Sequence, residues 1–172
     1  HIGRLELAAL IGLVITLGVS SVTGFMLDCA ELRQEVLRIH ILADSDQEAD
    51  QAVKLQVRDA VLEAINQDFS GDGTLEGTIA CLEGEMDRIE ETANEVLAEA
   101  GMPYQAKAEL TEMYFTTREY EQDGNTFSMP AGRYQALRIT LGSGEGHNWW
   151  CVAYPPMCID AAVEGQAAVV EQ

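Results

Sequence analysis

The side chains best suited to chemistry gather near the end of the chain, in a glycine-rich loop and the segment after it. Residues 142–151 read GSGEGHNWWC, and residues 154–158 read YPPMC. This stretch supplies an acid, an imidazole and two thiols, namely Glu145, His147, Cys151 and Cys158. A histidine paired with a thiol or a carboxylate is a common catalytic pair in nucleophilic or general acid–base catalysis. The stretch is therefore the first candidate for an active site.

A thiol–imidazole catalyst needs its two groups in hydrogen-bond contact. If residues 147–151 are extended, His147 and Cys151 point to the same face but lie about 13 Å apart, at about 3.3 Å per residue. A hydrolase that uses Cys151, or Glu145, with His147 is therefore kept only as an alternative. A disulfide between Cys151 and Cys158 across the Pro155-Pro156 turn is a second use of these thiols, which an exported location permits.

Two further motifs fail on inspection. The alternating glycines of residues 142–146 resemble a dinucleotide-binding loop, but that fingerprint requires a helix next, and an aromatic strand follows here. Asp44, Asp46 and Asp50 with His40 are a candidate metal site, in which Asp44 and Asp46 resemble the opening of a calcium loop, but the glycine and the final glutamate of that loop are missing. Ser45 and Glu48 have the spacing of a helix capping box, so we interpret these acids as helix-start residues. The sequence predicts no metal, no cofactor and no catalytic residue.

The elements that must hold these residues follow from the hydrophobic periodicity. Apolar residues recur every three or four positions in residues 47–66 and 74–100, which predicts two helices with one buried face each. Strands are predicted at residues 35–42, 104–120, 126–129, 134–141 and 149–154, with a hairpin turn at residues 122–125. In the last strand Trp149 and Trp150 alternate, so one packs in the core and the other is available to a partner. We expect an α+β fold in which two helices cover one face of a mainly antiparallel sheet.

The start of the chain carries a segment that fits a membrane. Residues 7–27 contain no charge, and 21 helical residues span about 30 Å of hydrocarbon. Arg4 precedes the segment, while Asp28 and Glu31 follow it, which favours an exported C-terminal part. We expect residues 1–28 to be a signal peptide or membrane anchor, residues 29–160 to be one domain, and residues 161–172 to be a tail. Cleavage after Ser20 or Gly24 and retention as an anchor both stay open.

The charge balance narrows the choice of partners. The chain has 10 Lys plus Arg against 29 Asp plus Glu, for a net charge of −19. A surface this acidic repels nucleic acid and anionic lipid headgroups. We therefore expect a membrane contact through the N-terminal segment alone, and no nucleic acid partner.

Two stretches carry a resemblance to a known family. Residues 38–61 read RIHILADSDQEADQAVKLQVRDAV, and residues 132–160 read GRYQALRITLGSGEGHNWWCVAYPPMCID. Together they resemble the stage II sporulation protein R family, exported signalling proteins of endospore-forming bacteria. Asp44 stands where the family more often has asparagine.

The resemblance implies a ligand and not an enzyme. It implies a protein that is made in the forespore, is exported into the space between two membranes, and activates a membrane-embedded aspartic protease of the mother cell. That protease would then process the sigma factor E precursor. The candidate partner-binding residues are Asp44, Ser45, Asp46, Glu145, His147, Asn148, Trp149 and Trp150. A structural module of the cell surface is a third interpretation.

Overall fold

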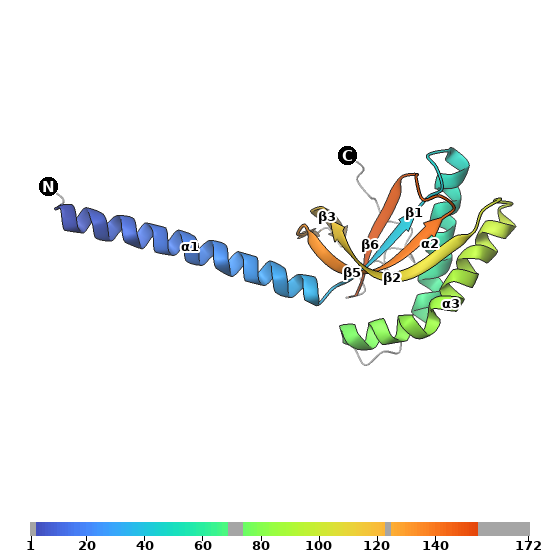
Figure 1. The fold of residues 1–172 in the computed structure, drawn as a ribbon, viewed down its shortest axis with the longest axis horizontal. Coiled ribbons are helices and arrows are strands. Elements are labelled where there is room, and N and C mark those ends of the chain that lie inside the picture. Colours follow the sequence, from blue (N-terminus) through green and yellow to red (C-terminus); the bar gives the residue numbers. More distant parts are fainter. Residues whose placement is uncertain (1–2, 69–73, 123–124, 155–172) are drawn as a thin grey trace. The chain divides into compact units, whose positions relative to one another are not determined.

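A computed structural model describes residues 3–68, 74–122 and 125–154 (Figure 1). It divides into two compact units, His1–Gln34 and Glu35–Gln172. Cys158 and the predicted tail at residues 161–172 lie outside the described residues.

The first unit is one long helix, α1 (Arg4–Gln34). Its stretch Leu7–Gln34 has a mean hydropathy of 2.1 in its most apolar window, and none of that window is buried. Twenty-eight helical residues are about 42 Å long, which exceeds the hydrocarbon thickness of about 30 Å. The helix therefore has the length and composition of a signal sequence or a membrane anchor. The helix continues beyond residue 28, which was the predicted end of the signal peptide or membrane anchor.

The second unit is built on a four-stranded sheet. Its strands are β1 (Leu37–Leu42), β2 (Ala106–Phe115), β5 (Gly132–Leu141) and β6 (Asn148–Tyr154), in the order β2-β5-β1-β6. The β2–β5 and β1–β6 pairs are antiparallel, and the central β1–β5 pair is parallel. The expected α+β fold with a mainly antiparallel sheet is confirmed.

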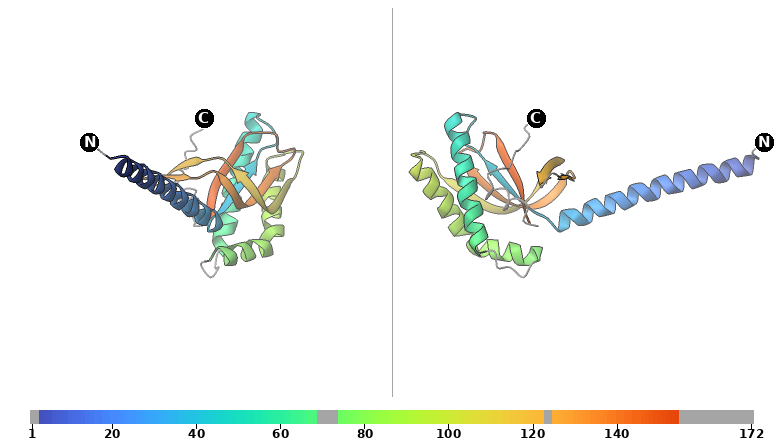
Figure 2. Two further views of the ribbon diagram at one scale, coloured as in Figure 1. Left: turned by 60° about the vertical axis from the view of Figure 1, so that its left-hand side comes forward. Right: turned by 180° about the vertical axis from the view of Figure 1, so that it is seen from behind.

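Two helices cover one face of this sheet, as Figures 1 and 2 show. They are α2 (Glu48–Asp68) and α3 (Leu75–Glu99), close to the predicted spans. Thr74 caps α3 by accepting a hydrogen bond from the Gly77 amide at 3.0 Å, which satisfies one free donor of the first turn. Asn94 of α3 also bonds both backbone groups of Ala106, so the helix protects the start of the edge strand β2.

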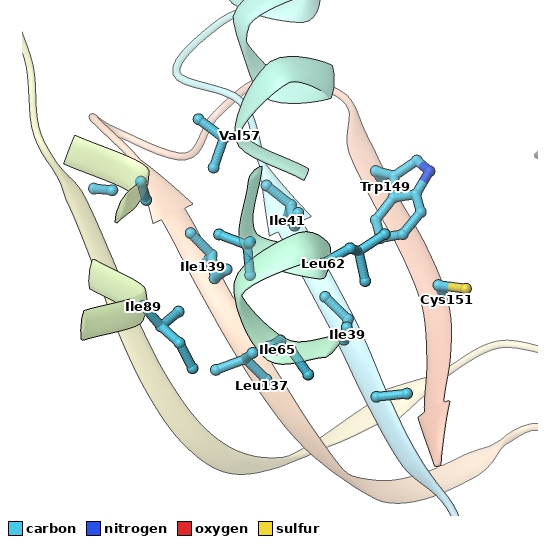
Figure 3. Packing of buried hydrophobic residues seen from close by; sticks show 14 of the residues in the cluster. Ile39, Ile41, Val57, Leu62, Ile65, Ile89, Leu137, Ile139, Trp149 and Cys151 are labelled. Atoms are coloured by element: carbon cyan, nitrogen blue, oxygen red, sulfur yellow. The ribbon is translucent and has the colours of Figure 1, made fainter. Parts of the chain in front are cut away.

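The main core lies between the helices and the sheet (Figure 3). Alternate strand residues point into it, as a period of two requires. Burying each large aliphatic side chain contributes roughly 1.5–3 kcal/mol, so this layer supplies most of the stability. The side chains labelled in Figure 3 include Ile39, Ile41, Val57, Leu62, Ile65, Ile89, Leu137, Ile139, Trp149 and Cys151.

One strand prediction was wrong. Residues 104–120 do not form a single strand, because β2 ends at Phe115 and β3 (Arg118–Gln122) belongs to a separate two-stranded sheet. The β3 strand pairs with β4 (Asn125–Met129), which confirms the predicted hairpin, although its central residues 123–124 lie outside the described residues. The break allows side chains of β3 to contact the second face of the main sheet, where the Arg38 guanidinium donates to the Tyr120 hydroxyl.

Candidate functional site

The two loops predicted to bind a partner meet at one end of the sheet. Strand β1 pairs with both β5 and β6, so its last residue, Leu42, lies opposite Thr140 on one side and Asn148 on the other. The loop that follows β1 is thereby placed beside the loop that connects β5 to β6. We call residues 43–47 and 142–148 together the joined loops.

Backbone hydrogen bonds connect the two loops directly. The Gly146 amide donates to the Ala43 carbonyl at 2.9 Å, and the Glu145 amide donates to the Asp44 carbonyl at 3.2 Å. The Ser143 hydroxyl donates to the same Asp44 carbonyl at 2.8 Å. The joined loops therefore behave as one continuous surface, although their residues are about a hundred positions apart.

Two carboxylates reinforce the junction. Asp44 Oδ1 accepts from the Ser143 amide at 2.6 Å, and Asp46 Oδ1 accepts from the His147 amide at 2.7 Å. The same Asp46 oxygen lies 2.5 Å from His147 Nδ1. Hydrogen bonds to ionised groups are roughly twice as strong as neutral ones. Asp44 and Asp46 thus bind the opposite loop and not the start of α2, whereas Asp50 lies in the first turn of α2 as predicted.

The alternating glycines are explained by close approach. A Cβ at Gly146 would lie 2.3 Å from the Ser45 carbonyl oxygen, and a Cβ at Gly142 would lie 2.1 Å from Asp44 Oδ1. Gly142 also has a φ of +56°, a backbone conformation that side chains disfavour. These positions need glycine because the two loops pass too close for a side chain.

A buried network supports the joined loops from below. Asp50, in the first turn of α2, accepts hydrogen bonds from the Ser45 hydroxyl and from the Tyr104 hydroxyl, the latter at 2.6 Å. These bonds hold the pKa of Asp50 below its usual value. The Ser45 hydroxyl accepts from the Gln47 amide at 3.2 Å. Ser45 therefore engages Asp50, and the predicted capping box with Glu48 is not the arrangement found.

The candidate residues differ in their exposure. The side chains of Asp46 and His147 are 58% and 64% exposed, so both are open to a partner. Trp149 is only 4% exposed and packs in the core, whereas Trp150 is half-buried on the opposite face. The prediction that one of the two tryptophans packs in the core is confirmed, and contact of Trp150 with a partner stays a prediction. Asn148 uses its side-chain oxygen to contact His40 Nε2 at 2.8 Å.

The chemistry available here is limited. Cys151 is 7% exposed and faces the main core, whereas His147 projects from an exposed loop. Across the described residues, no group of three or more His, Cys, Asp or Glu side chains could hold a metal ion. A bond between Cys151 and Cys158 stays a prediction, because Cys158 lies outside the described residues.

Sequence reasoning missed Lys54 and the structural role of the alternating glycines, which together position this surface. Lys54 of α2 is 5% exposed, and its Nζ donates to the His147 carbonyl at 3.1 Å. A buried lysine on the apolar side of a helix was the available signal. The spacing of Gly142, Gly144 and Gly146 was the other, since it marks close backbone approach.

Comparison with known proteins identifies the family of this chain. The family model described as stage II sporulation protein R (spore_II_R) matches residues 33–164. The chain is also similar to stage II sporulation protein R of Bacillus subtilis (strain 168), with 34% identity over 133 residues. That alignment covers 77% of this chain and 58% of the relative, so the chain spans somewhat more than half the relative's length. No solved structure matches. The family match covers most of the chain, including both halves of the joined loops, and the chain therefore belongs to the stage II sporulation protein R family.

Proposed function

We propose that this chain is an exported intercompartment signal of endospore formation. It activates a membrane-embedded aspartic protease of the mother cell, and that protease then processes the sigma factor E precursor. Family membership is the observation that carries this proposal, because it ties the chain to sporulation.

The apolar helix α1 supports export of the second unit. A segment of this length and hydropathy either spans the bilayer or directs the chain across it. The acidic second unit then lies in the space between two membranes, either released or anchored by α1. Its net negative charge disfavours adsorption to anionic lipid, which leaves its surface available to a protein partner.

The joined loops are the proposed contact with the protease. Asp46 and His147 are exposed, yet hydrogen bonds fix both to a rigid sheet end. A contact surface that is already ordered loses little conformational entropy on binding. Exposed polar groups on such a surface also give specificity through their charge and hydrogen-bond pattern.

The test is genetic complementation. A sporulating strain that lacks its own gene for this protein receives the chain with Asp46→Ala and His147→Ala together, and an immunoblot follows cleavage of the sigma precursor. We expect at least a tenfold loss of processing, about 1.4 kcal/mol of binding. The matched control replaces Arg133 and Glu112 by alanine, which removes another exposed pair, 3.4 Å apart, at a distance from the loops. Normal processing without any copy of the gene would refute the proposed function.

An exported hydrolase is the alternative, and one contact favours it. Asp46 orients the His147 imidazole as a carboxylate orients a catalytic base. The thiol version lacks a nucleophile in reach, because Cys151 faces the core. The two functions separate in a pull-down with the protease, in which the enzyme interpretation predicts that His147→Ala retains binding while it loses activity.

A further inference from the structure

The second face of the sheet, opposite the helices, carries a concentration of positive charge in a chain of net charge −19. Arg38 and His40 alternate with the core residues of β1, and Arg138 of β5 lies in register with His40. Arg118 of β3 contacts the same face by lying over Trp150, with its Cζ 3.9 Å from the ring centroid. We call Arg38, Arg118, Arg138 and His40 together the arginine face.

Arg38 is the buried member of this group. Its side chain is fully buried, and its Cζ lies 4.1 Å from the centroid of the Phe115 ring and 5.3 Å from that of Tyr134. Its Nη2 donates to the Tyr120 hydroxyl. Within the described residues, Arg38 Nε and Nη1 have no acceptor. Burial lowers the pKa of Arg38, but a guanidinium that titrates above about 12 in water stays charged at neutral pH.

The two partly exposed arginines are also incompletely paired. The Nε atoms of Arg118 and Arg138 are buried, and neither has an acceptor in the described parts of the chain. Arg138 Nη1 lies 3.5 Å from the Glu109 carboxylate, a long and half-exposed contact. Among the described ion pairs, Glu109 is the one carboxylate that meets any of these three guanidinium groups, and it meets Arg138 alone.

His40 adds a further polar atom without a partner. It is 5% exposed, and its Nδ1 has no hydrogen-bond partner in the described structure. Burial lowers the pKa of His40, the bond to Asn148 opposes this, and the charges of Arg138 and Arg38 add to it, so that the pKa is about 4. The imidazole is therefore neutral at neutral pH, so the arginines alone supply the positive charge.

Buried cations are costly unless they are paired, and proteins seldom leave them otherwise. We propose that the arginine face binds the carboxylate of an acidic side chain on a partner protein. Arg118 and Arg138 form its partly exposed side, and Arg38 forms its buried side. Trp150, the partly exposed ring of this face, suits the apolar stem of such a side chain.

The net charge of the chain favours a single carboxylate over a polyanion as the ligand of the arginine face. The chain as a whole repels polyanions, so a nucleic acid or a phosphate-rich surface would meet long-range repulsion. A lone carboxylate carries one charge and is attracted by the local field of three arginines at short range. His40 Nε2 touches the joined loops through Asn148, but binding of a carboxylate by the arginines does not depend on whether those loops contact the protease.

The experiment follows the arginine Nε–H resonances of the ¹⁵N-labelled full chain in detergent micelles. Sodium acetate is titrated as the carboxylate probe, with acetamide as its neutral counterpart and sodium chloride as the control for ionic strength. We expect saturable shifts of the Arg38, Arg118 and Arg138 resonances with acetate, and none with acetamide. Arg138→Gln and Arg118→Gln should each weaken acetate binding at least tenfold. Arg133→Gln, which removes an exposed arginine of the same strand as Arg138, should leave binding unchanged.

Three results would overturn the proposal. One is a shift that acetate and chloride produce equally, since that reports only ionic strength. Another is unchanged acetate affinity in both Arg118→Gln and Arg138→Gln, which avoid the buried Arg38 and so preserve folding. The third is saturable binding of inorganic phosphate under conditions where acetate does not bind, because the site would then take a different anion.

Discussion

Replacing Gly146 by alanine tests whether the joined loops are held together as described. The added Cβ would lie 2.3 Å from the Ser45 carbonyl oxygen and 2.5 Å from its carbon, both backbone atoms that a rotamer change cannot move. The loops must separate, which weakens the Gly146–Ala43 and Glu145–Asp44 backbone bonds. Each bond contributes roughly 0.5–1.5 kcal/mol, and the nearby charge-assisted bond from Asp46 to His147 is strained as well. We expect a loss of about 2–4 kcal/mol in the free energy of unfolding.

Urea unfolding of the full chain in micelles, followed by tryptophan fluorescence, measures this loss. Both tryptophans lie in β6, so the signal reports the sheet unit and not α1. The control is Gly84→Ala, in an exposed part of α3 where a Cβ meets nothing within 4 Å. That change should raise stability by about 1 kcal/mol, because alanine is the better helix former. If Gly146→Ala stays within about 0.5 kcal/mol of the parent chain, the loops are not joined as the hydrogen bonds indicate.

Three other changes test the surroundings of this surface. Asp46→Asn should lower the free energy of unfolding by less than about 1 kcal/mol, because the residue is exposed. The same change should reduce sigma precursor processing in the immunoblot. Asp59→Asn, at another exposed carboxylate, is the control and should leave processing unchanged. Tyr104→Phe removes one of the donors to buried Asp50 and should lower urea stability by about 1–2 kcal/mol. Because His40 has a folded pKa of about 4 and a usual pKa of 6.5, the unfolded chain binds its proton first as pH falls. Stability should therefore decline between those values by up to roughly 3 kcal/mol, and urea titrations of His40→Leu should show a flatter decline.

Local pattern was enough to predict the elements. The four-residue spacing of Val53, Val57 and Val61 predicted α2, and these side chains are buried. Alternation in β6 predicted that Trp149 and Trp150 face opposite ways, as they do. Such signals depend on which side of an element meets the core, and the sequence carries that information directly.

Pairing between distant segments could not be read in the same way. Residues 116–117 are both threonine, which suits a strand, so nothing in that stretch marked the end of β2 at Phe115. The parallel β1–β5 pair brings Asp44 to Ser143, but no local pattern encodes which strands become neighbours. Arg38 and His40 alternate with the apolar residues of β1, and nothing in that local pattern shows that both are buried beside Arg138.

The joined loops also have a consequence for timing. Their halves are 101 residues apart at the Asp46–His147 contact, and the second half precedes β6, the last strand that the structure describes. A chain that is still being synthesised or threaded through a membrane lacks this surface, however much of α2 and α3 has already formed. A partner that binds the joined loops would therefore bind only a chain in which both loops have been synthesised and have met. A truncated or partly transported chain would not bind that partner.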